Sequence, residues 1–200
     1  MSESYRDSLY CFVDIETTGS KPETSNIIEI AALLYAPPPT PLGKGRLIKS
    51  YASLVFCEDI PPKISELTGI EPEDLQGAPS LIPVLRVFKD LLQDHIFVAH
   101  NVAFDFNFIH CTSQQVLGEG LFNPQLCTLN LSRLCIPSPK HGLQFLNTHL
   151  GIKIPITHRA YADALIALKV FEHCLDALPL EITTTQDLLD YSTGKLDLAK

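Results

Sequence analysis

The sequence has no apolar run long enough to cross a bilayer, which takes about 20 consecutive residues in a helix. Its first eight residues, MSESYRDS, are polar and of mixed charge, and they lack the apolar stretch of a secretory signal. Both absences argue against a membrane-spanning or exported protein. We therefore expect a soluble, cytoplasmic protein that has no membrane partner.

Basic residues are scarce. The chain has 15 Lys and Arg against 23 Asp and Glu, which gives a formal net charge of -8. Because the chain as a whole repels phosphate backbones, binding of a nucleic acid would need a local patch or bound cations. The loop LGKGR (42–46) lacks the glycine and Ser/Thr spacing of a P-loop, so we expect a solvated basic turn there.

The cysteines form no C-x-x-C pair, although the sequence contains six of them. Several lie inside apolar stretches, and the pattern indicates buried thiols in a reducing compartment. It does not favour a zinc site or a disulfide framework. The six are Cys11, Cys57, Cys111, Cys127, Cys135 and Cys174.

The chain has enough apolar material for one sizeable core, since 46% of its 200 residues are hydrophobic. We see no internal repeat and no linker. Residues 1–178 are expected to form the catalytic domain. Residues 179–200 are more polar and are expected to form a C-terminal tail with one short helix, a candidate partner-binding segment.

Strands come first along the chain, and helices then alternate with strands. Residues 9–14, 26–36 and 46–57 are expected to form an antiparallel meander, followed by strands at 95–100 and in PQLCTL (124–129). Helices are expected at 80–94, 103–117, 141–151 and 160–178. This order predicts an α/β fold, in which a mixed five-stranded sheet (three antiparallel strands, then parallel strands) is flanked by helices.

The first candidate motif is FVDIETTG (12–19). Successive side chains of a strand point to opposite faces, so Asp14 and Glu16 point the same way. Close carboxylates repel each other and resist dehydration, and hard cations such as Mg²⁺ or Mn²⁺ relieve both effects. The motif alone also fits a structural role, in which Asp14 ends the strand and Glu16 is solvated.

Two later segments place further acids at helix starts. In HNVAFDFNFI (100–109), Asp105 stands among phenylalanines near the start of a helix. In HRAYADA (158–164), His158 precedes the last long helix and Asp163 lies in its first turns. Each acid alone also fits a favourable charge near a helix N-terminus.

Taken together, the three segments indicate one site. Four carboxylates can hold two divalent ions, which stabilise the attacking and leaving oxygens of a phosphoryl displacement. Histidine, with an ordinary pKa of about 6.5, is suited to act as the base.

These three motifs resemble those of the DnaQ-like (DEDDh) 3′–5′ exonucleases, the family that includes the epsilon proofreading subunit of bacterial DNA polymerase III. The order, spacing and flanking apolar residues match over about residues 8–176. The resemblance implies a ribonuclease H-like fold and two Mg²⁺ or Mn²⁺ ions per site. It also implies that Asp14, Glu16, Asp105 and Asp163 are the metal ligands and that His158 is the general base.

The resemblance also places two threonines beside the substrate. Backbone and side chains around Thr17 approach the terminal nucleotide in the family. The segment LTGI (67–70), which contains Thr68, resembles a stretch that borders the 3′ end.

The resemblance implies a metal-dependent 3′–5′ exonuclease that hydrolyses single-stranded or frayed DNA 3′ ends to nucleoside 5′-monophosphates, in replication proofreading. A DNA polymerase catalytic subunit is a candidate partner. Two alternatives remain open at this point. One is an exoribonuclease of the same family that trims RNA 3′ ends, and the other is an interaction module of a polymerase assembly.

Overall fold

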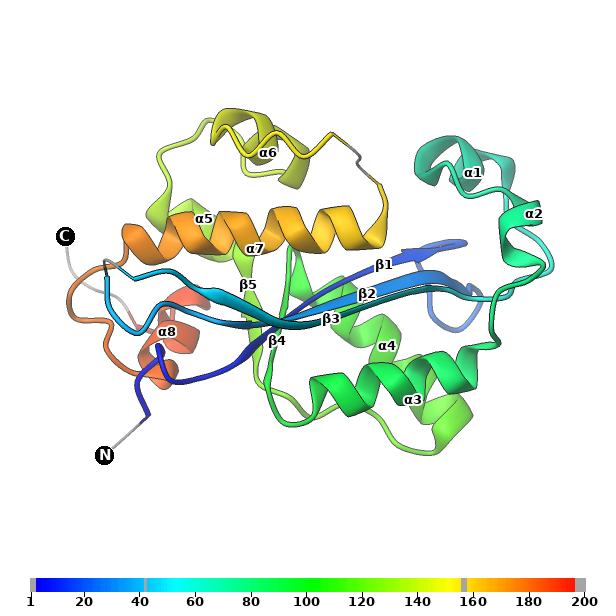
Figure 1. Cartoon of the computed structure of the whole chain (residues 1–200), viewed down its shortest axis with the longest axis horizontal. Helices are drawn as coiled ribbons and strands as arrows, with labels where there is room; N and C mark the ends of the chain where they lie inside the picture. Colours follow the sequence, from blue (N-terminus) through cyan, green and yellow to red (C-terminus); the bar gives the residue numbers. More distant parts are fainter. Residues whose placement is uncertain (1–2, 42, 156–157, 197–200) are drawn as a thin grey trace.

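The computed structural model describes residues 3–41, 43–155 and 158–196. It contains one five-stranded sheet of order β3-β2-β1-β4-β5 with helices on both faces (Figure 1). The strands are β1 (Tyr10–Thr17), β2 (Ile27–Ala36), β3 (Arg46–Leu54), β4 (Ile96–Ala99) and β5 (Gln125–Cys127). The first three strands pair antiparallel, and β4 and β5 pair parallel, which confirms the predicted mixed sheet.

The helices expected at 80–94, 103–117, 141–151 and 160–178 are all present, and so is a short helix in the C-terminal segment. The helices before β5 are α1 (Pro62–Thr68), α2 (Pro72–Leu75), α3 (Leu81–Leu92) and α4 (Val102–Leu117). Those after β5 are α5 (Thr128–Cys135), α6 (Leu143–His149), α7 (Ala160–Asp176) and α8 (Thr185–Ser192). None of these described helices is long and apolar enough to cross a membrane.

Strand β1 is longer than the pattern of apolar residues suggests. The predicted strand ends at Asp14, but the observed strand continues to Thr17, because β2 pairs with it as far as Ile27. Asp14 and Glu16 therefore both lie inside the strand, and they share the face that carries Tyr10 and Phe12.

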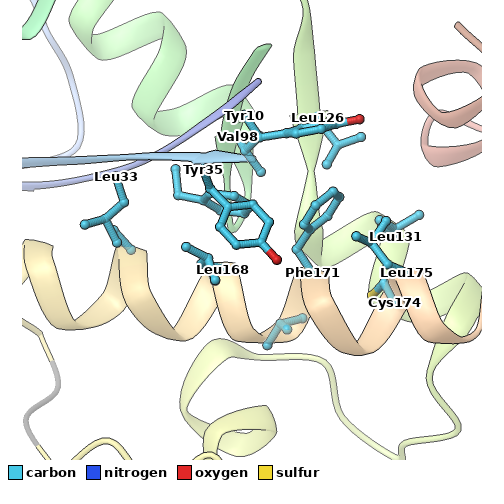
Figure 2. Close-up of a cluster of buried hydrophobic side chains, with 14 of the residues drawn as sticks. Tyr10, Leu33, Tyr35, Val98, Leu126, Leu131, Leu168, Phe171, Cys174 and Leu175 are labelled. Atoms are coloured by element: carbon cyan, nitrogen blue, oxygen red, sulfur yellow. The ribbon is translucent and has the colours of Figure 1, made fainter. Parts of the chain in front are cut away.

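The core on one face of the sheet lies between the strands and α7. Phe171 of α7 is fully buried, and its ring centroid lies 4.9 Å from that of Tyr10 and 5.3 Å from that of Phe12 (Figure 2). Leu33 and Leu168 are buried in the same cluster. This packing fixes α7 along β1, and so places the start of α7 near the acidic end of that strand.

A second core fills the opposite face. Val13 and Ile15 of β1 pack there against Val84 and Phe88 of α3 and Phe108 of α4. Residues of β1 thus alternate between the two cores, which matches the period of a strand buried on both sides.

The segment after α7 packs on the same domain. Leu188 of α8 is fully buried in the α7-side core. Thr185 donates its backbone N–H to the carbonyl of Glu3 at 3.0 Å, so this segment also contacts the N-terminal residues. Residues 197–200 of the expected tail lie outside the described residues, and its partner-binding role stays a prediction.

The six cysteines are free thiols, of which Cys11, Cys127 and Cys174 are buried as expected, while Cys57, Cys111 and Cys135 are only partly buried.

Candidate active site

The site begins with two carboxylates on β1. Asp14 and Glu16 project from the α7 side of the strand toward the first turns of α7, where Asp163 lies. One carboxylate oxygen from each of these three residues lies within 4.8 Å of the others. The structure thus brings two distant motifs together.

Asp105 lies in the first turn of α4, the helix that follows the neighbouring strand β4. The parallel pairing of β1 with β4 stops at Phe12 and Val98, and α4 begins three residues after the end of β4. Asp105 is buried at that point, and the backbone of Ile15, next to Asp14, is close enough to lower its pKa. Its carboxylate lies outside the 4.8 Å group, but among charged neighbours it has the largest effect on the pKa of Asp14.

His158 lies at the entrance to α7. Its backbone N–H donates to Oδ2 of Asp163 at 3.2 Å, so the two residues of the third motif are in direct contact. Its φ angle of 56° is in the left-handed region, which is uncommon for a residue with a side chain. Among the described residues no hydrogen bond engages its imidazole, which leaves the ring nitrogens available to a substrate or water.

Mutual repulsion and burial dominate the electrostatics of the site. Burial first, and then the charge of Asp105, raise the pKa of Asp14 well above its usual range. Burial first, and then the charge of Asp163, raise the pKa of Glu16 to about 8. Burial also raises the pKa of Asp105 to about 7, although backbone hydrogen bonds oppose the shift. The acids together therefore hold protons that a cation can displace.

The donor set fits a divalent cation. It consists of carboxylate oxygens only, which is the ligand type that hard cations such as Mg²⁺ and Mn²⁺ prefer. After burial, repulsion from neighbouring carboxylates raises the pKa of Asp14 and of Glu16, and a bound cation would remove that repulsion. Binding would therefore be favoured by charge as well as by ligand type.

Two polar residues that the sequence analysis did not identify as site residues hold the start of α7. Gln144 of α6 donates from Nε2 to Oδ1 of Asp163 at 2.9 Å. Glu29 of β2, which the motifs do not include, forms a bidentate ion pair with Arg159. A buried acid inside an apolar strand was the only sequence signal for this pair, and no signal pointed to Gln144.

The two threonines end regular elements, since Thr17 is the last residue of β1 and Thr68 is the last residue of α1. Thr17 donates its hydroxyl to the carbonyl of Gly19 at 2.7 Å. Thr68 donates to the carbonyl of Ile64 at 2.9 Å and accepts from the N–H of Ile70 at 3.1 Å. Both hydroxyls therefore bind backbone groups of their own segments. Contact with a substrate remains a prediction for each.

Comparisons with known proteins place this architecture among the nucleases. The model of the exonuclease family (RNase_T) matches residues 11–171. DNA polymerase III subunit epsilon of Aquifex aeolicus is 32% identical over 180 residues, covering 89% of this chain and 86% of the relative. A PolC-type DNA polymerase III of Clostridium perfringens is 35% identical over 202 residues, which cover 99% of this chain and 13% of the relative.

Solved structures agree on the fold. Escherichia coli exonuclease I in its zinc-bound complex with single-stranded DNA superposes with a TM-score of 0.76 at 18% identity, over 92% of this chain and 42% of that one. The chain thus spans most of the epsilon subunit, but less than half of exonuclease I and about a seventh of the PolC-type enzymes. The expected ribonuclease H-like fold is confirmed. On its sequence, its fold and the arrangement of its acids, the chain belongs to the exonuclease family, whose members depend on divalent metals.

Proposed function

We propose that this protein is a 3′–5′ exonuclease that removes nucleoside 5′-monophosphates from single-stranded or frayed DNA 3′ ends in replication proofreading. The observation that carries the proposal is the convergence of Asp14, Glu16 and Asp163 within 4.8 Å, beside Asp105 and His158. Similarity to a DNA polymerase III epsilon subunit over most of both chains supports DNA as the substrate.

We propose that the acids bind the cations and that the histidine accepts the proton. Asp14, Glu16, Asp105 and Asp163 would hold the cations, which we propose to be two Mg²⁺ or Mn²⁺ ions. When bound, these ions would neutralise the charge that develops on the phosphate and on the leaving 3′-oxygen. His158 would take the proton from the attacking water at its imidazole.

We propose that two segments of the chain position the substrate. We propose that the segments of Thr17 and Thr68 contact the terminal nucleotide. A terminal nucleotide must leave the duplex to reach acids held inside such a site, and this favours single-stranded or mismatched ends. We propose that the activity is cytoplasmic and that a DNA polymerase catalytic subunit is the partner.

The test compares four labelled substrates in parallel: single-stranded DNA, a 3′-mismatched primer–template, a matched duplex and single-stranded RNA. Each is assayed with Mg²⁺, with Mn²⁺ and with EDTA. We expect shortening from the 3′ end, release of nucleoside 5′-monophosphates, and faster digestion of single-stranded and mismatched DNA than of matched duplex. EDTA and the Asp14→Asn substitution should each abolish turnover.

Three outcomes would contradict the proposal. Full activity of Asp14→Asn would remove the site assignment, and faster digestion of RNA than of DNA would favour the exoribonuclease alternative. Cation binding without cleavage of any substrate would favour a non-catalytic module of a polymerase assembly.

A further inference from the structure

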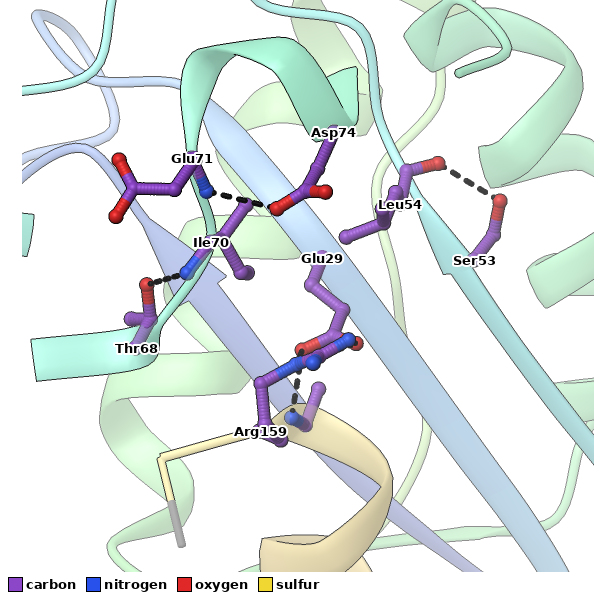
Figure 3. A network of polar contacts seen from close by, with 9 residues as sticks. Glu29, Ser53, Leu54, Thr68, Ile70, Glu71, Asp74 and Arg159 are labelled. Carbon is purple, nitrogen blue, oxygen red and sulfur yellow. Dashed lines mark hydrogen bonds and ion pairs between the residues drawn. The ribbon is translucent and has the colours of Figure 1, made fainter. Parts of the chain in front are cut away.

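An ion pair between Glu29 and Arg159 connects the start of α7 to strand β2. Glu29 lies on β2 with its side chain 7% exposed, and its two carboxylate oxygens accept from Nε and Nη2 of Arg159 at 3.1 and 2.9 Å. Oε2 of Glu29 also accepts the backbone N–H of Ala160 at 2.9 Å. Figure 3 shows Arg159, at the start of the helix, lying against Glu29 of the strand.

The carboxylate of Glu29 replaces the side-chain N-cap of α7. Arg159 is the N-cap residue of α7, and its side chain makes no capping hydrogen bond. The carboxylate of Glu29, 131 residues away in sequence, satisfies the N–H of Ala160 instead. A negative charge at a helix N-terminus also interacts favourably with the helix dipole. Glu29 therefore fixes where the helix begins.

The position of Glu29 next to the site is otherwise unfavourable. It lies directly opposite Glu16 in the β1–β2 ladder, and like charges opposite each other destabilise a sheet. Its charge also contributes to the raised pKa values of Asp14 and Glu16. The Arg159 side chain is 39% exposed, and a partly exposed ion pair contributes little folding energy, so the pair is better explained by a need for fixed geometry.

The residue that this geometry constrains is His158. It precedes Arg159 directly, and its φ of 56° is a conformation that persists only where the surroundings enforce it. Arg159 itself is extended, with φ -136° and ψ 125°. With Arg159 held by Glu29 and the N–H of His158 held by Asp163, the backbone is fixed on both sides of the His158 Cα–C bond.

We propose that Glu29 and Arg159 form a positioning pair that holds His158 in place as the base and does not contact substrate or cation. This inference rests on the proposed function, because it assigns the pair a role in the same reaction. A mispositioned base lowers the rate of the chemical step, and a displacement of about 1 Å can cost about 100-fold.

The kinetic test uses graded variants. Glu29→Gln keeps the shape of the side chain and an acceptor for the N–H of Ala160. Arg159→Lys keeps the positive charge but loses the planar guanidinium group. Glu29→Gln combined with Arg159→Met, the double variant, removes both charges without leaving either one unpaired. Lys169→Met removes a surface ion pair of the same helix and serves as the matched control. We expect kcat to fall about 10- to 100-fold in the double variant, less in Arg159→Lys, and not in the control. KM for oligonucleotide and the half-saturating cation concentration should change less than about twofold.

Epistasis with the base separates positioning from a general structural effect. If the pair acts through His158, adding the double variant to His158→Ala should lower kcat no further, because the base is already absent. Multiplicative losses in the combined variant would overturn the proposal. So would a raised KM at unchanged kcat, which would make Arg159 a substrate contact, or a weakened cation affinity, which would make Glu29 part of the metal site.

An activity-independent measurement tests the pair even if the protein proves not to be a nuclease. Amide hydrogen exchange of Ala160 should be at least about tenfold faster in the double variant, while that of buried β1 amides is unchanged. Unchanged exchange at Ala160 would show that the pair does not fix the start of α7, and would overturn the proposal whatever the enzyme does. Failure of the proposed function would instead appear as an inactive wild-type protein with normal protection at Ala160.

Discussion

Gln144 donates a 2.9 Å hydrogen bond from Nε2 to Oδ1 of Asp163, while its own Oε1 is buried with no hydrogen-bond partner among the described residues. The backbone N–H of His158 binds the other oxygen, Oδ2, of the same carboxylate. Asp163 is therefore oriented from two directions before any cation or substrate arrives. Residues that orient a metal ligand commonly affect metal affinity as strongly as they affect structure.

Gln144→Ala should accordingly weaken cation binding. We expect the Mn²⁺ or Mg²⁺ concentration for half-maximal activity to rise about tenfold, which is within the range seen when an outer-shell partner is removed. Gln144→Glu should be worse, because it places a further negative charge beside Asp163. Activity measured over a series of cation concentrations tests both variants.

Gln114→Ala is the matched control for Gln144, since Gln114 is exposed on α4 and donates to the carbonyl of Gly118, the C-cap of the same helix. Its cation dependence should equal that of the wild type. Gln144→Met should cost little folding stability, because it also removes a buried oxygen that has no partner. An unchanged cation requirement in Gln144→Ala would mean that Asp163 does not need this contact.

The metal-free protein should lose stability as pH rises. Burial and then neighbouring charges raise the pKa of Glu16 to about 8, and burial raises that of Asp105 to about 7, while unfolded carboxyls titrate near 4. Between these values the folded state holds more protons than the unfolded state, so the free energy of unfolding falls from about pH 4 to about pH 8. Added cation should stabilise most at the upper end of this window.

Urea unfolding in EDTA at a series of pH values measures this slope. Asp105→Asn and Glu16→Gln should each flatten the profile, since each removes one of the groups whose pKa is raised. A metal-free stability that increases from pH 5 to pH 8 would contradict the arrangement of acids described here. His100 acts in the opposite direction and only at the acidic end, because burial lowers its pKa to about 4.

Local patterns were enough to predict the main elements and the convergence of the motifs. The alternation of β1 placed Asp14 and Glu16 on one face, and the periodicity of α7 placed Asp163 in the first turns of a helix, while the packing of that helix on β1 came from the structure. The chain order of strands and helices predicted a mixed five-stranded sheet, and the structure supplied the strand order. The residues that such reasoning finds are those whose neighbours in sequence reveal their surroundings.

The contacts that orient the site were not predictable in this way. Glu29 and Arg159 are 130 residues apart, and neither the strand pattern nor the third motif indicates that they meet. Gln144 occupies an ordinary position in a short amphipathic helix, and its link to Asp163 depends on how α6 packs on α7. The N-cap role of Glu29 was equally hidden, because sequence rules for helix caps consider only local residues.

Packing between α7 and β1 should determine stability without determining chemistry. Phe171 is fully buried between Tyr10 and Phe12, so Phe171→Ala leaves a cavity and should cost about 3–5 kcal/mol of folding free energy. For a chain of this size each kcal/mol lowers Tm by about 2–4 °C, so a clear shift is expected in thermal unfolding. Phe122→Ala is the matched control, because Phe122 is 88% exposed and its loss should change Tm little.

At a temperature where Phe171→Ala remains folded, kcat should stay within a few-fold of the wild-type value, because the acids are held by β1, by the start of α4 and by the polar contacts at the start of α7. A loss of activity as large as that of Asp14→Asn in fully folded Phe171→Ala would show instead that core packing itself sets the positions of the acids.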